Sequence, residues 1–295
     1  MDLFVQLLLN GLVAVSLYAL VAVGFALIFA ATRHFHIAHA AVFAAGGYFA
    51  YFLTDFLPVG LAVAAAVLLS VVLGVALVTL LYRPLERRGG AGFVLFLVSL
   101  GALIVIDNVF TVGLGAQPAR LAAGSWFATT VAIGEWSLIA GQVALIVVAF
   151  LLFGGLVTLL AKTRMGKLVQ AFSGNPEFVE IVGRKPQVVL VVVYALGSLL
   201  AAVAGVYVAA DTGMQPGLGE TFFIVSVMAV IIGGIGSITG SFVAAMLLGL
   251  LQNVLLLVMG AEWTLAAIFV LFLVLITVSP EGLAKINFRR VKASA

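Results

Sequence analysis

The side chains that could carry chemistry are few in this chain, and its three histidines stand close together. His34, His36 and His39 fall within six residues of one another. A structural zinc site needs four ligands in a fixed geometry, and the chain has no cysteine and no fourth histidine. We therefore expect no metal site here. A polar break at a membrane boundary is the simpler interpretation, and a pH-sensitive role is the alternative.

Asp107 is an acidic residue inside an apolar run, with Asn108 next to it and Thr111 one helical turn later. An ionisable side chain at the centre of a membrane span costs about 2.5–3.5 kcal/mol on insertion scales, so it is a functional candidate by default. We expect Asp107, Asn108 and Thr111 to line a polar path for a substrate. The alternative is that Asp107 lies near the outer end of its helix and reaches water. Tyr18 and His39 are also assigned to the expected path.

A glycine-rich stretch, GGIGSITG at residues 233–240, interrupts a long apolar run. It lacks the spacing of a dinucleotide-binding loop, and the chain has no GxxxxGK[ST] motif, so ATP binding by this chain itself is not expected. One interpretation is close helix packing through small residues. The other is a discontinuous helix in which Gly233, Gly234 and Gly236 expose backbone dipoles to a substrate path. Since no catalytic constellation is visible, we expect no catalytic residues and no cofactor.

Residues 162–186 form the longest polar interruption of the sequence, and they contain a short predicted helix. Asn175 suits the N-cap and Pro176 the first helical position, while Glu177 favours the positive end of the helix dipole. Gly183 is a typical C-terminal stop. Three apolar side chains at helical spacing share one face: Phe178, Ile181 and Val182. Because two turns of helix are unstable alone in water, we expect this face to dock on another protein; folding back onto the chain's own bundle is the alternative.

The elements that must position these residues are apolar helices. The 295 residues are 65% hydrophobic and 8% charged, and five long stretches lack Asp, Glu, Lys and Arg altogether: 3–32, 56–82, 136–161, 187–210 and 221–261. About 20 residues of helix cross a membrane, and the alternating pattern of barrel strands is absent. We predict an all-α polytopic membrane protein with a single domain over residues 1–295. It should have eight or nine transmembrane helices, including broken or re-entrant segments at residues 40–53 and 221–260.

The basic residues predict the orientation of the chain. Clusters at 83–88, 162–185 and 285–292 hold twelve of the fourteen Lys and Arg residues, leaving out Arg33 and Arg120. By the positive-inside rule these clusters face the cytoplasm, so residues 114–135 form an outer loop. If Arg33 also faces inward, the N-terminus lies outside and the spans number nine. A net charge of +3 that is gathered beside apolar runs gives no indication of nucleic-acid binding.

Six motifs together resemble a known family. They stand in the sequence as GLVAVSLYALVAVGFALIFA from Gly11, HIAHAAVFAAGGY from His36, YRPLERR from Tyr82, KTRMGKLVQAFSGNPEFVEIVG from Lys162, GGIGSITGSFVAAMLLGLLQ from Gly233, and SPEGL from Ser279. In this order they resemble the LivH-type permease of branched-chain amino-acid ABC importers, over nearly the whole chain. The chain departs from the family at residues 36–40, where it keeps only Ala38 and His39, so the substrate stays open.

This resemblance implies partners and a location. Such permeases pair with a second, LivM-type permease, two cytoplasmic ATP-binding subunits and a periplasmic substrate-binding protein, in the inner membrane of bacteria. It also implies that residues 175–183 are the coupling helix that engages an ATPase subunit. Related permeases carry urea, short amides and other small organic acids.

Two functions of different classes follow from these observations. The first is the permease subunit of an ABC importer, passing a small polar solute such as a branched-chain amino acid by alternating access. The second is an ATP-independent secondary transporter or channel for a solute such as urea or an amide, for which Asp107 and the broken helix would suffice. A membrane enzyme is not expected, because acid, base and metal-binding groups do not cluster. ATP dependence of uptake separates the first two.

Overall fold

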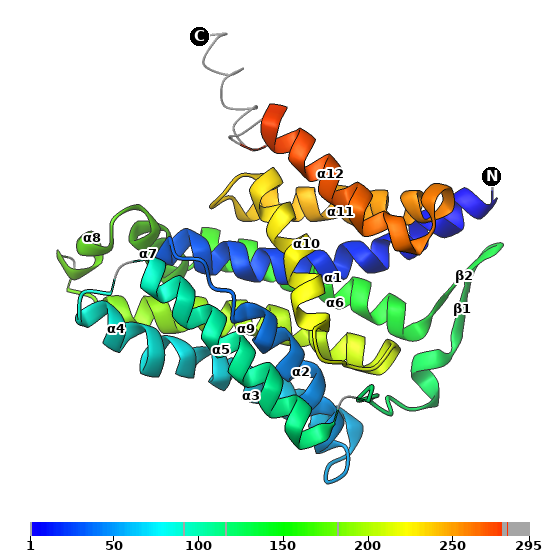
Figure 1. Cartoon of the computed structure of the whole chain (residues 1–295), viewed down its shortest axis with the longest axis horizontal. Helices are drawn as coiled ribbons and strands as arrows, with labels where there is room; N and C mark the ends of the chain where they lie inside the picture. Colours follow the sequence, from blue (N-terminus) through cyan, green and yellow to red (C-terminus); the bar gives the residue numbers. More distant parts are fainter. Residues whose placement is uncertain (1, 91, 116, 182, 279–281, 283–295) are drawn as a thin grey trace.

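The protein is a bundle of apolar helices, seen in a computed structural model that describes residues 2–90, 92–115, 117–181, 183–278 and 282 (Figure 1). Its helices are α1 (Asp2–Thr32), α2 (His39–Leu53), α3 (Val59–Ala76), α4 (Arg83–Arg87), α5 (Gly92–Leu114), α6 (Ala140–Lys162), α7 (Arg164–Gly174), α8 (Pro176–Ile181), α9 (Pro186–Asp211), α10 (Leu218–Gly233), α11 (Ile238–Met259) and α12 (Ala261–Val278). A π-helical segment, Leu77–Tyr82, joins α3 to α4. The prediction of an all-α polytopic membrane protein is confirmed.

The number of membrane passes stays a prediction. Within the described residues, six helices are long and apolar enough to span a bilayer: α1, α3 continued through α4, α5, α6, α9 and α11. Three shorter apolar helices, α2, α10 and α12, would raise the number to nine if each also crosses. The run at residues 221–260 is split at its glycines as predicted, but unequally. α10 has 16 residues, whereas α11 has 22 and is a full-length span.

The core of the bundle is formed by α1, α2 and α9, which are buried over most of their length. Small residues bring their backbones together. A Cβ added to Gly24 of α1 would lie 2.8 Å from the carbonyl oxygen of Gly197 in α9, and one added to Gly47 of α2 would lie 2.9 Å from that of Gly205. Helices in lipid associate by such close packing, because apolar burial gives no advantage there. α5 and α6 instead expose most of their apolar side chains at the periphery.

The two ends of the bundle differ in kind. α4, α7 and α8 gather at the left end in Figure 1, and they carry basic residues from the clusters at 83–88 and 162–185. The opposite end carries the described start of the chain and a hairpin of β1 (Thr130–Ile133) and β2 (Trp136–Ile139), paired antiparallel. The sequence predicted only an outer loop there. The hairpin forms because Gly134, with φ of +67°, suits a two-residue turn between strands.

The polar interruption forms two helices in place of the single one expected. α7, which was not predicted, begins where the Thr163 hydroxyl accepts a hydrogen bond from the Gly166 N–H at 3.0 Å. It buries Val169 and Phe172 against the bundle. α8 is the predicted short helix, and Asn175 Oδ1 accepts a hydrogen bond from the Glu177 N–H at 2.9 Å. Gly183 ends it with φ of +73°. Val182 and the basic cluster at 285–292 lie outside the described residues.

Candidate functional site

Three of the predicted path residues come from different helices and share α10 as a neighbour. The Tyr18 ring of α1 lies 5.8 Å from the Phe222 ring, and the His39 ring of α2 lies 6.3 Å from the Phe223 ring, between centroids. The Asp107 carboxylate of α5 lies near the Gly217 backbone, just before α10. These contacts fall on the segment just before α10 and on its first two turns. The short helix α10 is therefore the element around which the candidates are arranged.

Asn108 and Thr111 make their hydrogen bonds within α5. The Asn108 side chain is exposed and donates to the Ile104 carbonyl at 2.7 Å. The Thr111 hydroxyl donates to the Asp107 carbonyl at 2.8 Å. Both side-chain donors therefore find their hydrogen-bond acceptors within α5. The place of both residues on a solute path remains a prediction.

The glycine stretch forms a tight turn between α10 and α11. Gly234 and Gly236 have φ of +97° and +90°, a conformation that favours glycine. A Cβ on Gly233 would overlap the Gly240 backbone, so the ends of the two helices are in near contact. Ser237 caps α11, its hydroxyl accepting from the Gly240 N–H at 3.0 Å. This geometry supports the packing interpretation, and it also leaves α10 a short, interrupted pass through the bundle.

The histidine segment is buried and linked to tyrosines from distant parts of the chain. His34 Nε2 lies 2.8 Å from the Tyr194 hydroxyl, and His36 Nδ1 lies 2.9 Å from that of Tyr82. The Tyr82 hydroxyl donates to Ser99 Oγ at 3.1 Å, and Ser99 also accepts from the Ala38 N–H at 2.9 Å. Tyr82 ends the π-helical segment, a feature that often marks a functional position. This network ties the α1–α2 connection to the π-helical segment, α5 and α9.

Burial determines the charge of the two histidines in that connection. It lowers the pKa of His34 to about 4 and that of His36 well below its usual value, with the neighbouring His39 and His34 adding to the effect on His36. Both rings are therefore neutral near pH 7. His39 is fully buried and packs against Gly24 and Phe25 of α1. In the part of the chain that the structure describes, no three His, Asp or Glu side chains gather as metal ligands would.

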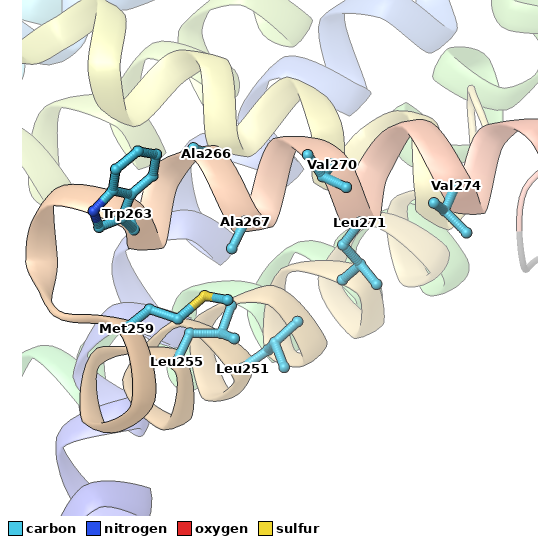
Figure 2. A pocket seen from close by; sticks show the side chains of 9 residues that line it. All are labelled: Leu251, Leu255, Met259, Trp263, Ala266, Ala267, Val270, Leu271 and Val274. Carbon is cyan, nitrogen blue, oxygen red and sulfur yellow. The ribbon is translucent and has the colours of Figure 1, made fainter.

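The larger of the two cavities described below is unsuited to a polar solute, because its walls are apolar. It measures about 720 Å³ and opens between α11 and α12, with walls formed by Leu251, Leu255, Met259, Trp263, Ala266, Ala267, Val270, Leu271 and Val274. Figure 2 shows the α11 side chains facing Ala267 and Leu271 of α12 across it. Solute sites place a few polar groups among apolar walls. An all-apolar groove suits acyl chains or another helix.

A second cavity, of about 380 Å³, lies between the α1–α2 connection, α5, α10 and α12, and its surface is almost entirely apolar. Its walls carry Leu103, Ile224, Val227 and Phe272, and Glu220 from the first turn of α10 also lines it. Within the described part of the chain, Glu220 Oε2 is buried without a hydrogen-bond partner. The sequence analysis did not select Glu220 as a site residue. The signal that could have found it is an acidic residue in the first turn of a broken apolar helix.

At the basic end of the bundle, α8 presents the predicted apolar face. Phe178 is 52% exposed and Ile181 is 79% exposed, whereas Val179 between them is fully buried. Val179 thus fixes α8 on the bundle, and the other two side chains project away from it. Asn175, Pro176, Glu177 and Gly183 are exposed around this face. The arrangement offers two apolar anchors on a helix that is held in place by its own residues.

Comparison with known proteins agrees with this architecture. The family model described as the permease component of branched-chain amino acid transport systems matches residues 7–278. The high-affinity branched-chain amino acid transport system permease protein BraD of Pseudomonas aeruginosa is 27% identical over 296 residues, covering 95% of each chain. The LivH permease protein of Escherichia coli is 24% identical over 294 residues, again covering 95% of each.

The similarity reaches permeases of other substrates over shorter stretches. The ribose import permease protein RbsC of Escherichia coli is 32% identical over 102 residues, which is 32% of each chain. No solved structure matches the chain. Since the family model covers residues 7–278 and these two permease relatives cover 95% of the chain, the chain belongs to the family of branched-chain amino acid transport permease components.

Proposed function

We propose that this chain is the permease subunit through which a bacterial ABC importer passes branched-chain amino acids, or closely similar small solutes, across the inner membrane. Family membership and the polytopic helical bundle support the transport role. The names of the relatives that match over 95% of the chain support the substrate class. The proposed partners are two cytoplasmic ATP-binding subunits, a second related permease and a periplasmic substrate-binding protein. ATP hydrolysis is assigned to the ATP-binding subunits.

The observation that carries this proposal is the apolar face of α8. Phe178 and Ile181 stand exposed on a short helix at the end of the bundle where the basic clusters gather. Those clusters predict a cytoplasmic location, where exposed apolar side chains have no lipid to cover them. An amphipathic helix that inserts such anchors into a groove is a common recognition mode. Burying each side chain would contribute about 1.5–3 kcal/mol.

Val179 explains how α8 could transmit movement. Its side chain is fully buried, and α8 packs on α7 and α9. α7 in turn contacts α1 and α6. A push on Phe178 and Ile181 would therefore reach the core helices α1 and α9 through packed side chains. We infer that Asn175, Pro176, Glu177 and Gly183 shape this coupling helix, and that its displacement drives alternating access.

The Phe178→Asp substitution tests this coupling. The side chain is half exposed, so the variant should fold and insert into the membrane normally. We expect it to lose the ATP-binding subunits during co-purification and to abolish substrate-stimulated ATP hydrolysis, because a charge cannot enter an apolar groove. Phe178→Leu is the matched control and should keep most of both activities. A full complex with normal stimulation in Phe178→Asp would show that α8 is not the coupling element.

The competing function is ATP-independent transport, which the Asp107 carboxylate beside interrupted α10 would favour. Uptake of labelled leucine into proteoliposomes containing the assembled complex separates the two. We expect uptake with ATP and its loss with a non-hydrolysable analogue. Equal uptake in both conditions would contradict the ABC importer and support a secondary transporter or channel.

A further inference from the structure

Two buried histidines tie the α1–α2 connection, residues 33–38, to distant parts of the chain. His34 Nε2 lies 2.8 Å from the Tyr194 hydroxyl of α9, and His36 Nδ1 lies 2.9 Å from the Tyr82 hydroxyl of the π-helical segment. The His34 ring also packs on Tyr82 with centroids 5.2 Å apart, and the His36 ring packs on Tyr194 with centroids 5.0 Å apart. Each histidine therefore bonds to one tyrosine and packs against the other.

Ser99 of α5 extends this arrangement to a fourth element. The Tyr82 hydroxyl donates to Ser99 Oγ at 3.1 Å, and the Ala38 N–H of the connection donates to the same oxygen at 2.9 Å. Since Tyr82 uses its only proton for Ser99, the His36 Nδ1–H donates to the Tyr82 oxygen. A neutral His36 ring with its proton on Nδ1 thus completes the network.

An added proton would meet no acceptor at either ring. His34 Nδ1 and His36 Nε2 are buried and have no hydrogen-bond partner within the described residues. A second proton on either ring would place a charge in a buried site, where an uncompensated charge is costly. Burial accordingly lowers the pKa of His34 to about 4 and that of His36 well below its usual value.

The groups that surround the two rings do not compensate such a charge. In the described chain, the titratable or charged groups of the connection and of the elements packed on it are Arg33, His39 of α2, Tyr82, Tyr194 of α9, and Arg83 and Glu86 of α4. From α5 comes Ser99, which does not titrate. The one carboxylate among these groups, that of Glu86, makes no hydrogen bond to either histidine.

Proton binding is therefore linked to opening of the connection. In water each ring would regain a pKa near the ordinary value of about 6.5, so the open form binds protons more readily than the closed form. The closed form then keeps its full advantage above about pH 6.5 and loses it progressively as the pH falls below that value.

We propose that this arrangement is a pH-sensitive latch, formed by His34, His36, Tyr82, Tyr194 and Ser99. It holds the α1–α2 connection against α5, α9 and the π-helical segment while both rings are neutral, and it releases the connection when they are protonated. Tyr82 directly precedes α4 at the basic end of the bundle (Figure 1), so in the predicted orientation the latch responds to acid on the cytoplasmic side. This inference goes beyond the proposed transport function, because it requires neither a particular solute nor a partner subunit.

Amide hydrogen exchange in the full-length permease in detergent measures the release. The Ala38 N–H reports on the latch, because Ser99 Oγ accepts its hydrogen bond. After correction for the intrinsic pH dependence of exchange, opening at residues 33–38 should rise between about pH 7.5 and about pH 5.5 by about tenfold for each ring that titrates. Exchange in α6, which contains no histidine, is the internal control and should not change.

A double variant, His34→Gln with His36→Asn, removes the titration but keeps hydrogen-bonding groups in the network. The Gln amide can reach the position of Nε2, and the Asn amide can reach that of Nδ1. We expect opening at residues 33–38 to be independent of pH in this variant, because neither amide takes up a proton.

Tyr82→Phe tests the geometry of the latch at neutral pH. It removes the hydroxyl shared by His36 and Ser99 and should increase opening of the connection about tenfold, the effect of about one lost hydrogen bond. Tyr51→Phe is the matched control, because Tyr51 is an exposed tyrosine of α2, and it should leave the connection unchanged.

Three results would overturn the latch: equal corrected exchange at both pH values in the wild type, a pH dependence that persists in the double variant, or a rise that α6 shares equally. Unchanged opening in Tyr82→Phe would overturn it as well. Exchange is measured without substrate, ATP or ATP-binding subunits. A failed latch therefore leaves the transport proposal standing, and failed leucine uptake leaves the latch standing.

Discussion

Asp107 owes its position to contacts that reach beyond its own helix. Its carboxylate lies near the Gly217 backbone and within electrostatic range of the buried Tyr48 hydroxyl. An ionisable group in a span is retained where it meets polar partners. These contacts connect α5 and α2 to the start of α10, so Asp107 can affect transport without being the main contact to the solute.

Two substitutions at Asp107 should have graded effects. Asp107→Asn keeps a carbonyl acceptor beside the Gly217 backbone but loses the charge, so we expect normal assembly with reduced uptake at limiting substrate. Asp107→Leu removes every hydrogen-bonding group of the side chain. Leaving neighbouring polar groups without a partner costs about 1–3 kcal/mol, so the thermal unfolding temperature should fall as well. Proteoliposome uptake and thermal unfolding in detergent measure both effects. If uptake is unchanged in both variants, Asp107 is merely a water-exposed residue at a helix end.

The histidines show what sequence spacing can and cannot predict about single residues. Their crowding indicated a break between two helices, and the break is present at residues 33–38. Their partners could not be predicted, because Tyr82 is 46 positions from His36 and Tyr194 is 160 positions from His34. Tyr48 and Glu220 escaped selection for the same reason: each has a buried oxygen without a hydrogen-bond partner in the described structure, and only the folded bundle creates that burial.

At the scale of elements, hydropathy predicted the long apolar helices well, but it did not predict the short elements between them, α7 and the β hairpin. All long apolar runs form helices, and glycines at residues 233–240 split one run as expected. α7 was missed because its apolar residues are few and its polar face resembles a loop. The β hairpin was missed because each strand has only four residues. In both cases packing against the bundle stabilises a segment whose own sequence signal is weak.

Glycine contacts between α2 and α9 should be essential to the core. A Cβ on Gly205 would overlap the Phe43 carbonyl oxygen of α2, and backbone atoms cannot move aside cheaply. Gly205→Ala should therefore destabilise the permease by about 1–3 kcal/mol, the usual cost of overpacking. Gly155→Ala in α6 is the control, since nothing lies within 4 Å of the added methyl group. Thermal unfolding of both variants in detergent is the measurement; equal unfolding temperatures would contradict the packing role.

On the scale of the whole molecule, the α8 face and the start of α10 lie toward opposite ends of the bundle. The α8 face is at the basic end, and α9 runs from that end toward the link to α10 (Figure 1). α8 buries Val179 and packs on α7 and α9, and α9 leads directly into α10. This path gives a physical route by which docking at one end could move helices at the other.

The basic clusters make a sharp prediction about sidedness. Residues 83–88 and 162–185 should face the cytoplasm, and Arg33 should lie on the same side because its segment bonds to Tyr82 of the π-helical segment after α3. Single cysteines at Arg87 and Arg184, both exposed, should react with a membrane-impermeant maleimide only after the membrane is opened. A cysteine at Glu135, exposed in the β hairpin turn, should react in intact spheroplasts. By the positive-inside rule we expect the cluster at 285–292, which lies outside the described residues, to behave like Arg87. Labelling of Arg87→Cys from outside, or protection of Glu135→Cys, would reverse the orientation and remove α8 from the reach of any cytoplasmic ATPase.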